Sequence, residues 1–168
     1  SELNHLNGEM RDRGALPVWI QTSASEEAIS GWSNYAALQS PEGWSRRSEE
    51  LAPGHEGFRL HPSLDVHDTD LFSVKTRFSA FIHGASDLND QLRARGVDTV
   101  LIAGVATGVC CESTARDAMM LNYRVIMVSD ALAALTFESH ENSLKALFGL
   151  FADVQSTQQV LEHARVQT

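Results

Sequence analysis

The chain has 168 residues, of which 43% are hydrophobic, a composition that fits a single globular domain over residues 1–168 with its own core. Acidic residues outnumber basic ones by 22 to 13, and the formal net charge of −9 disfavours nucleic acid or an anionic membrane surface as a partner. No apolar run approaches the roughly 18 residues of a membrane-spanning helix, and the two cysteines are adjacent free thiols, so a reducing, cytoplasmic location is expected.

Helical and extended segments alternate along the chain. A polar helix is expected over residues 2–14, where Gly14 closes it, and an apolar strand over 16–22. Residues 23–62 are rich in serine, glycine, proline and charge, and we expect a long irregular segment there. The elements expected after it are, in chain order, a strand at 70–75, a helix at 86–96, a strand at 98–105, a helix at 107–122, a strand at 123–131, a helix at 138–151, a strand at 153–157 and a helix at 156–166.

This alternation of strands and helices predicts an α/β domain with a parallel sheet covered on both faces. Residues 98–105 are almost continuously apolar, which is typical of a strand buried on both faces. Ligands of such sheets bind beyond the carboxyl ends of the strands. Two segments of chemical interest lie at such ends, namely Lys75 with the residues after it and the corner at residues 104–110.

Cys110 falls in the first turn of the helix that follows this corner, if that helix begins near residue 107. The N-terminus of a helix carries partial positive charge, which favours a thiolate, and its N–H groups can hold the oxyanion of a tetrahedral intermediate. A nearby lysine such as Lys75 would stabilise the thiolate further. The alternatives are that Cys110 and Cys111 are small buried hydrophobic residues and that Lys75 is a solvated surface lysine.

Four segments together resemble a known family. They are GVATGVCCESTARDA (104–118), YRVIMVSDA shortly after it, KTRFSAF (75–81) upstream and ESHENSLKALFGLFADV near the end. The pattern is similar to that of the isochorismatase-like cysteine hydrolases, a superfamily that includes N-carbamoylsarcosine amidases, nicotinamidases and isochorismatases. The resemblance implies a three-layer α/β/α fold with a mostly parallel, doubly wound sheet. It also implies a Cys–Asp–Lys triad that hydrolyses C–N bonds of small amides and N-carbamoyl compounds without a cofactor.

The resemblance assigns roles to particular residues of this chain. Cys110 matches the nucleophile and Lys75 the lysine of the triad. A cis peptide bond between Val105 and Ala106 is implied, with the N–H groups of Ala106 and Cys110 forming the oxyanion hole. Cys111 stands where the family usually has valine or a similar residue, so it is expected to pack.

Four further residues are candidates for the substrate pocket. Trp32 and Phe81 can wall a cavity, although single aromatic residues more often cover a core. Arg77 can pair with a substrate carboxylate, with a structural salt bridge as the alternative. Thr107 is a candidate at the cysteine corner itself.

No metal site is expected. The segment HPSLDVHDTD contains possible metal ligands, namely His61, Asp65, His67, Asp68 and Asp70. However, clustered polar residues in a loop are usually solvated. Metal-dependent relatives carry paired histidines shortly after the second strand, and the corresponding TSASEEAISGW (22–32) has none.

The aspartate of the family triad, at the end of the first strand in a motif like D-x-Q-N, has no counterpart in this chain. The first strand is therefore expected to be absent, which leaves an unpaired edge or a gap in the sheet. Asp130 matches a structural position, while Glu112 and Asp117 lie wrongly on the helix to replace the acid. Three explanations stay open: a chain incomplete at its N-terminus, which we favour, a truncated and inactive protein, or an acid from another subunit.

The sequence thus favours a cofactor-free cysteine hydrolase acting on a small amide or N-carbamoyl compound. One alternative is vinyl-ether hydrolysis of the isochorismatase type, which needs the acid but no thiol. The other is a catalytically inactive interaction or structural member of the fold. Assembly into a homodimer or homotetramer is expected from the resemblance alone.

Overall fold

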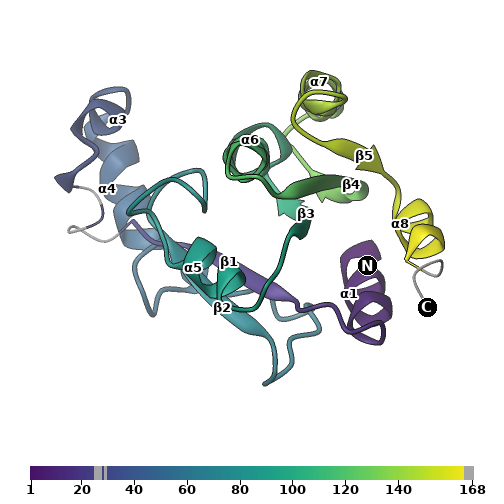
Figure 1. Cartoon of the computed structure of the whole chain (residues 1–168). Helices are drawn as coiled ribbons and strands as arrows, with labels where there is room; N and C mark the ends of the chain where they lie inside the picture. Colours follow the sequence, from purple (N-terminus) through teal and green to yellow (C-terminus); the bar gives the residue numbers. More distant parts are fainter. Residues whose placement is uncertain (25–27, 29, 165–168) are drawn as a thin grey trace.

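The computed structural model describes residues 1–24, 28 and 30–164, and it confirms the predicted α/β fold class (Figure 1). The strands are β1 (Val18–Thr22), β2 (Leu71–Lys75), β3 (Thr99–Val105), β4 (Arg124–Ala133) and β5 (Asp153–Gln155). The α-helices are α1 (Glu2–Arg11), α3 (Ser33–Ala37), α4 (Pro41–Glu50), α5 (Leu88–Arg93), α6 (Glu112–Met120), α7 (Phe137–Leu147) and α8 (Thr157–His163). A short 3-10 helix, η1 (Glu56–Phe58), and a π-helical turn, η2 (Thr107–Cys111), complete the described elements.

The strands form two parallel sheets. β1 pairs with β2 in register from Val18 opposite Leu71 to Thr22 opposite Lys75, and the second sheet has the order β3–β4–β5. Within the described part of the chain no strand pairing joins β1 to β3, so each has one paired edge. The two sheets nevertheless lie side by side, with β1 and β2 on one side of Figure 1 and β3 to β5 on the other.

Helices cover both faces of the β3–β4–β5 sheet. Alternate residues of β4 point to opposite faces, so neighbouring residues pack against different helices. Met127 belongs to the larger core cluster, together with Ala115 of α6 and Leu147 of α7. The next residue, Val128, belongs to a second cluster with Leu6 of α1 and other residues on that face. Figure 1 accordingly shows α6 and α7 on one side of this sheet and α1 and α8 on the other.

The prediction that residues 98–105 are buried on both faces is wrong in part. Ile102 is the buried residue of β3, whereas Thr99 and Val105 are exposed and the others are partly exposed. The reason is that β3 pairs along one edge with β4, and no described strand covers its other edge. An apolar run is therefore compatible with a strand that is only half surrounded.

The prediction of a long irregular segment at residues 23–62 is also wrong, because α3, α4 and η1 lie there. Residues 25–27 and 29 of that segment lie outside the described residues. The start of α4 has clear local causes: Ser40 caps it, accepting a hydrogen bond from the Gly43 N–H at 3.0 Å, and Pro41 occupies the first helical turn. Among the described residues, no helix has both the length and the apolar character needed to cross a membrane.

Candidate active site

The structure brings Lys75 and Cys110 together. Lys75 is the last residue of β2, and Cys110 lies in η2, directly after β3. The ammonium of Lys75 donates to the carbonyl oxygen of Arg77 at 2.9 Å and to Sγ of Cys110 at 3.3 Å. Lys75 is 4% exposed, while Cys110 is partly exposed. The reactive groups of both residues therefore meet at the carboxyl ends of strands from two different sheets.

The turn that carries Cys110 has an unusual backbone. The peptide bond between Val105 and Ala106 is cis. The N–H groups of Val109 and Cys111 both donate to the carbonyl oxygen of Ala106, at 3.1 and 3.2 Å, which winds this turn more widely than an α-helix. Because η2 continues directly into α6, Cys110 lies near the N-terminal, electropositive end of a continuous helical segment.

The loop after Lys75 is tied to the nucleophile helix. The N–H of Ala80 donates to Oγ1 of Thr114 at 3.2 Å, and Thr114 lies one turn beyond Cys110 on the same helical segment. The hydroxyl of Ser86 donates to the carbonyl oxygen of Ala80 at 2.6 Å. Phe81 packs in the larger core cluster, with its ring 5.1 Å from that of Tyr123. These contacts fix the lysine loop against α6.

The buried ammonium of Lys75 has no carboxylate partner among residues 1–24, 28 and 30–164. None of the ion pairs formed there involves Lys75, although its side chain is buried. A buried ammonium is costly unless an anion or several dipoles compensate it. The ammonium is in contact with the sulfur of Cys110 and with the carbonyl oxygen of Arg77.

The three carboxylates weighed as substitute acids have other places in the structure. Asp130 accepts hydrogen bonds from the N–H and hydroxyl of Thr157, both at 2.8 Å, at the start of α8. Glu112 accepts from Arg116 and Ser143, and Asp117 lines a surface hollow beside Met120. None of these contacts reaches Lys75 or Cys110.

Cys111 differs sharply from its neighbour. It is 5% exposed and belongs to the larger core cluster. Burial, and after it the adjacent Cys110, raise the pKa of Cys111 to about 12, although Lys75 acts in the opposite direction. At neutral pH this residue is therefore a protonated thiol that packs in the core.

The four predicted pocket residues are all engaged by protein groups. The guanidinium of Arg77 donates to the carbonyl oxygens of Ala28 and Thr76, both at 2.9 Å, and lies over the ring of Trp32 at 5.0 Å. Phe81 lies in the core, as described above. Thr107 is fully buried, and its hydroxyl lies 3.0 Å from Nδ1 of His140. Their role in binding a substrate stays a prediction.

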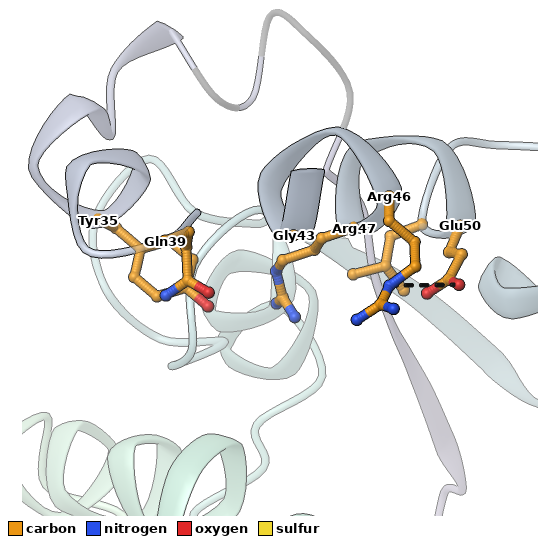
Figure 2. A pocket seen from close by; sticks show the side chains of 7 residues that line it. Tyr35, Gln39, Gly43, Arg46, Arg47 and Glu50 are labelled. Carbon is orange, nitrogen blue, oxygen red and sulfur yellow. Dashed lines mark ion pairs between the residues drawn. The ribbon is translucent and has the colours of Figure 1, made fainter. Parts of the chain in front are cut away.

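A surface hollow of about 260 Å³ lies between α3 and α4, apart from the reactive pair (Figure 2). Its lining does not include Lys75 or Cys110 and consists of Tyr35, Gln39, Gly43, Arg46, Arg47, Glu50 and Leu51. Arg46 and Glu50 form an ion pair across 3.9 Å at its edge, drawn as the dashed line in Figure 2. The stacked rings of Trp32 and Tyr35, 4.4 Å apart, link this region to Arg77 and thus to the lysine loop.

The polar segment at residues 61–70 serves the fold. Asp70 is buried and accepts hydrogen bonds from the indole of Trp19 at 2.8 Å, from the guanidinium of Arg11 at 3.0 Å and from the His67 N–H at 2.9 Å. Burial alone would raise the pKa of Asp70, but these donors together bring it below its ordinary value. In the part of the chain that the structure describes, no group of three or more His, Cys, Asp or Glu is arranged to hold a metal ion.

Sequence reasoning missed the residues that support the nucleophile turn. They are Thr114, which accepts a hydrogen bond from the lysine loop, His140, whose Nδ1 lies against the hydroxyl of Thr107 in η2, and Ser143, which donates to Glu112 directly after η2. A weak signal existed for two of them, because His140 and Ser143 are three residues apart in a predicted helix and so share a face. Nothing in the sequence indicated which element that face would meet.

The sequence of this chain is similar to those of known proteins of one family. Residues 1–159 match the family described as "Isochorismatase domain". The chain is 36% identical over 104 residues to the uncharacterized isochorismatase family protein YwoC of Bacillus subtilis, covering 62% of this chain and 54% of that protein. It is 37% identical over 117 residues to the ureidoacrylate amidohydrolase RutB of Acinetobacter baylyi, covering 67% and 47%. This chain therefore spans about half the length of these two relatives.

The fold is similar to that of solved cysteine hydrolases. The crystal structure of a cysteine hydrolase from Pseudomonas syringae pv. phaseolicola matches with a TM-score of 0.84 at 25% identity, covering 98% of this chain and 78% of that one. The similarity thus extends over both sheets and the helices around them.

Proposed function

Because the chain belongs to the isochorismatase family, we propose that it is a cysteine-dependent hydrolase that cleaves a C–N bond of a small amide or N-carbamoyl compound. The observation that carries this proposal is the 3.3 Å contact between the Lys75 ammonium and Sγ of Cys110. The name of one relative, ureidoacrylate amidohydrolase, supports the same class of bond.

In the proposed reaction the Cys110 thiolate attacks the carbonyl carbon of the substrate. The C–S bond forms as the C=O π electrons move to oxygen, and the N–H groups of Ala106 and Cys110 hold that oxyanion. The Lys75 ammonium stabilises the thiolate before attack, and it offsets negative charge at the site during the reaction. No cofactor is needed for either step.

The second half of the reaction needs a proton donor. As the tetrahedral intermediate collapses, the C–N bond breaks and the amine leaves with a proton from an acid. The acyl group remains on Cys110 as a thioester. A water molecule attacks its carbonyl carbon and gives a proton to the carboxylate that the acid has become, and the C–S bond then breaks to release the acyl product and regenerate the thiolate. We propose that this acid is a carboxylate outside the described residues, for example one from another subunit of a homodimer or homotetramer.

The test is amide turnover by the full-length protein and two cysteine variants. Ammonia release is measured with ureidoacrylate, N-carbamoyl amino acids and nicotinamide. Cys110→Ala should lower kcat/KM for the best substrate by at least about a thousandfold. Cys111→Ala is the matched control, because it makes the same substitution one residue further along the same turn.

The outcomes distinguish thiol-dependent amide hydrolysis from vinyl-ether hydrolysis and from a non-catalytic protein. Retained turnover in Cys110→Ala rejects the nucleophile, and hydrolysis of a vinyl ether by that variant favours the alternative chemistry that needs no thiol. Absence of turnover in the parent protein on every amide favours a non-catalytic member of the fold.

A further inference from the structure

The nucleophile turn is held at its first residue by α7. Thr107 opens η2, is fully buried and has its Oγ1 3.0 Å from Nδ1 of His140. Thr107 directly follows Ala106, whose carbonyl oxygen accepts the hydrogen bonds of Val109 and Cys111 that wind the turn. A movement of the Thr107 side chain is therefore passed to the backbone on both sides of Cys110.

The same helix also holds the other end of the turn. Glu112 follows Cys110 by two residues, and its Oε2 accepts a hydrogen bond from the hydroxyl of Ser143 at 2.6 Å. Arg116 donates to Oε1 of Glu112 at 2.7 Å. Ser143 Oγ also lies 3.4 Å from the carbonyl oxygen of Thr107, but a hydroxyl has one proton, and the shorter, charged contact takes it. Ser143 therefore anchors the Glu112 end, and His140 remains the polar partner of Thr107.

The two anchors lie on one face of α7. His140 and Ser143 are one helical turn apart, so their side chains reach the same neighbour. α7 also packs closely against the turn between them: a Cβ built at Gly108 would lie 3.7 Å from Cβ of Ser143 and 3.8 Å from the carbonyl oxygen of Ser139. One rigid helix thus sets the position of both ends of η2.

We propose that His140 is a positioning residue that acts on catalysis through Thr107. By holding the hydroxyl of Thr107, it fixes the direction of the Ala106 and Cys110 N–H groups and of the sulfur beside Lys75. This inference rests on the proposed function, in which those groups form the oxyanion hole and the nucleophile. A displacement of such groups by a fraction of an ångström lowers the rate of the chemical step more than it lowers substrate affinity.

The test uses the distinct positions of the two ring nitrogens. In His140→Asn the side-chain amide occupies the place of Nδ1, whereas in His140→Gln it occupies the place of Nε2 and cannot meet Thr107 in the same way. We expect His140→Gln to lower kcat about tenfold, the effect of losing one hydrogen bond, with KM within about twofold, and His140→Asn to restore most of the loss. His163→Gln, on the exposed face of α8, is the matched control and should leave kcat unchanged.

A double-mutant cycle identifies the partner. Thr107→Val removes the hydroxyl while it keeps the shape of the side chain, and combining it with His140→Gln should cause little loss beyond either single change. Losses that multiply fully in the double variant, or equal kcat in the Asn and Gln variants, overturn the proposal. Thermal unfolding of each variant is measured alongside, because a purely structural role would lower Tm without the rescue of kcat by asparagine.

A second readout does not require turnover. The rate of Cys110 alkylation by iodoacetamide is measured for the same variants, and it should fall in His140→Gln and recover in His140→Asn. If the parent protein hydrolyses no amide, the proposed function fails while the alkylation rates still test His140. If amide turnover is present and neither rate responds to His140→Gln, the positioning role alone is rejected.

Discussion

Replacing Lys75 by methionine tests the charge pair on which the proposed chemistry depends. The change removes an ammonium 3.3 Å from Sγ of Cys110 and keeps an unbranched side chain of similar length. Two opposite unit charges at this separation attract by about 1 kcal/mol in water and by about 5 kcal/mol at an effective dielectric constant of 20. Because Cys110 is partly exposed and Lys75 is buried, we expect a value between these limits and at least about 1.4 kcal/mol, which corresponds to a tenfold change in the rate at which the sulfur reacts.

The assay is alkylation by iodoacetamide at pH 7, followed by peptide mass spectrometry. The thiolate is the reacting form, so Cys110 in Lys75→Met should react at least about tenfold more slowly than in the parent. Cys111 is an internal reference, since a pKa of about 12 keeps it protonated and unreactive. The matched control is Lys145→Met, which removes the other lysine of the chain, exposed on α7 and paired with Glu141 at 3.4 Å.

The substitution should not unfold the protein, which makes the result interpretable. Removing one partner of a charge pair is strongly destabilising where the other charge stays buried and unpaired. Cys110 is partly exposed and becomes a neutral thiol when it takes up a proton, so no buried charge is left behind, and urea unfolding of Lys75→Met beside the parent checks that the variant is folded. If the variant is folded and its Cys110 still reacts within about twofold of the parent rate, the ammonium does not activate this sulfur. The proposed role of Lys75 would then be abandoned.

Two further predictions concern stability. Asp70→Asn should lower the free energy of unfolding by about 2 kcal/mol at pH 7, because it removes the charge that strengthens the hydrogen bonds from Arg11, while exposed Asp68→Asn should change little. Since the pKa of Asp70 is lowered on folding, its contribution is present above about pH 4 and is lost as the pH falls through the folded-state value, so parent and variant should converge in acid urea titrations. Gly8→Ala inside α1 should raise the free energy of unfolding by about 0.5 to 1 kcal/mol, because a Cβ there meets nothing within 4 Å. Gly96→Ala should lower it by about 1 kcal/mol, because the φ of Gly96 is 68°, in the left-handed region. Thermal shifts of the same sign in the two variants would contradict this reasoning.

The order of strands and helices could be predicted because it depends on local patterns. The strand at 70–75 and the helix at 156–166 correspond to β2 and α8, and the cap of α8 by Ser156 is a signal that acts over a few residues. α4 was missed because PEGWSRRSEE has no apolar face; the local features it does have are the Ser40 cap and one exposed i,i+4 ion pair, Arg46 with Glu50. The burial of β3 was overestimated because an apolar run does not reveal how many neighbours a strand has.

The site could be predicted in part, for a different reason. Cys110 and Lys75 are 35 residues apart, and the pairing of their motifs came from a resemblance to a family, since periodicity alone does not relate two loops. Thr114 and His140 could not be found in this way. Their contacts join a helix to a loop of another element, and such contacts depend on the packing of α6 and α7.

The reactive pair spans two sheets that share no backbone pairing among the described residues. Within one sheet, ladder hydrogen bonds would set the distance between two strand ends, but here that distance depends on side-chain and loop contacts. On the lysine side these are the Ala80 to Thr114 hydrogen bond and the burial of Phe81, and on the cysteine side the hold of α7 on Thr107. The 3.3 Å separation of nitrogen and sulfur is therefore a property of packing between the two sheets, so substitutions far from the sulfur that loosen this packing act on the same charge pair as a change of Lys75 itself.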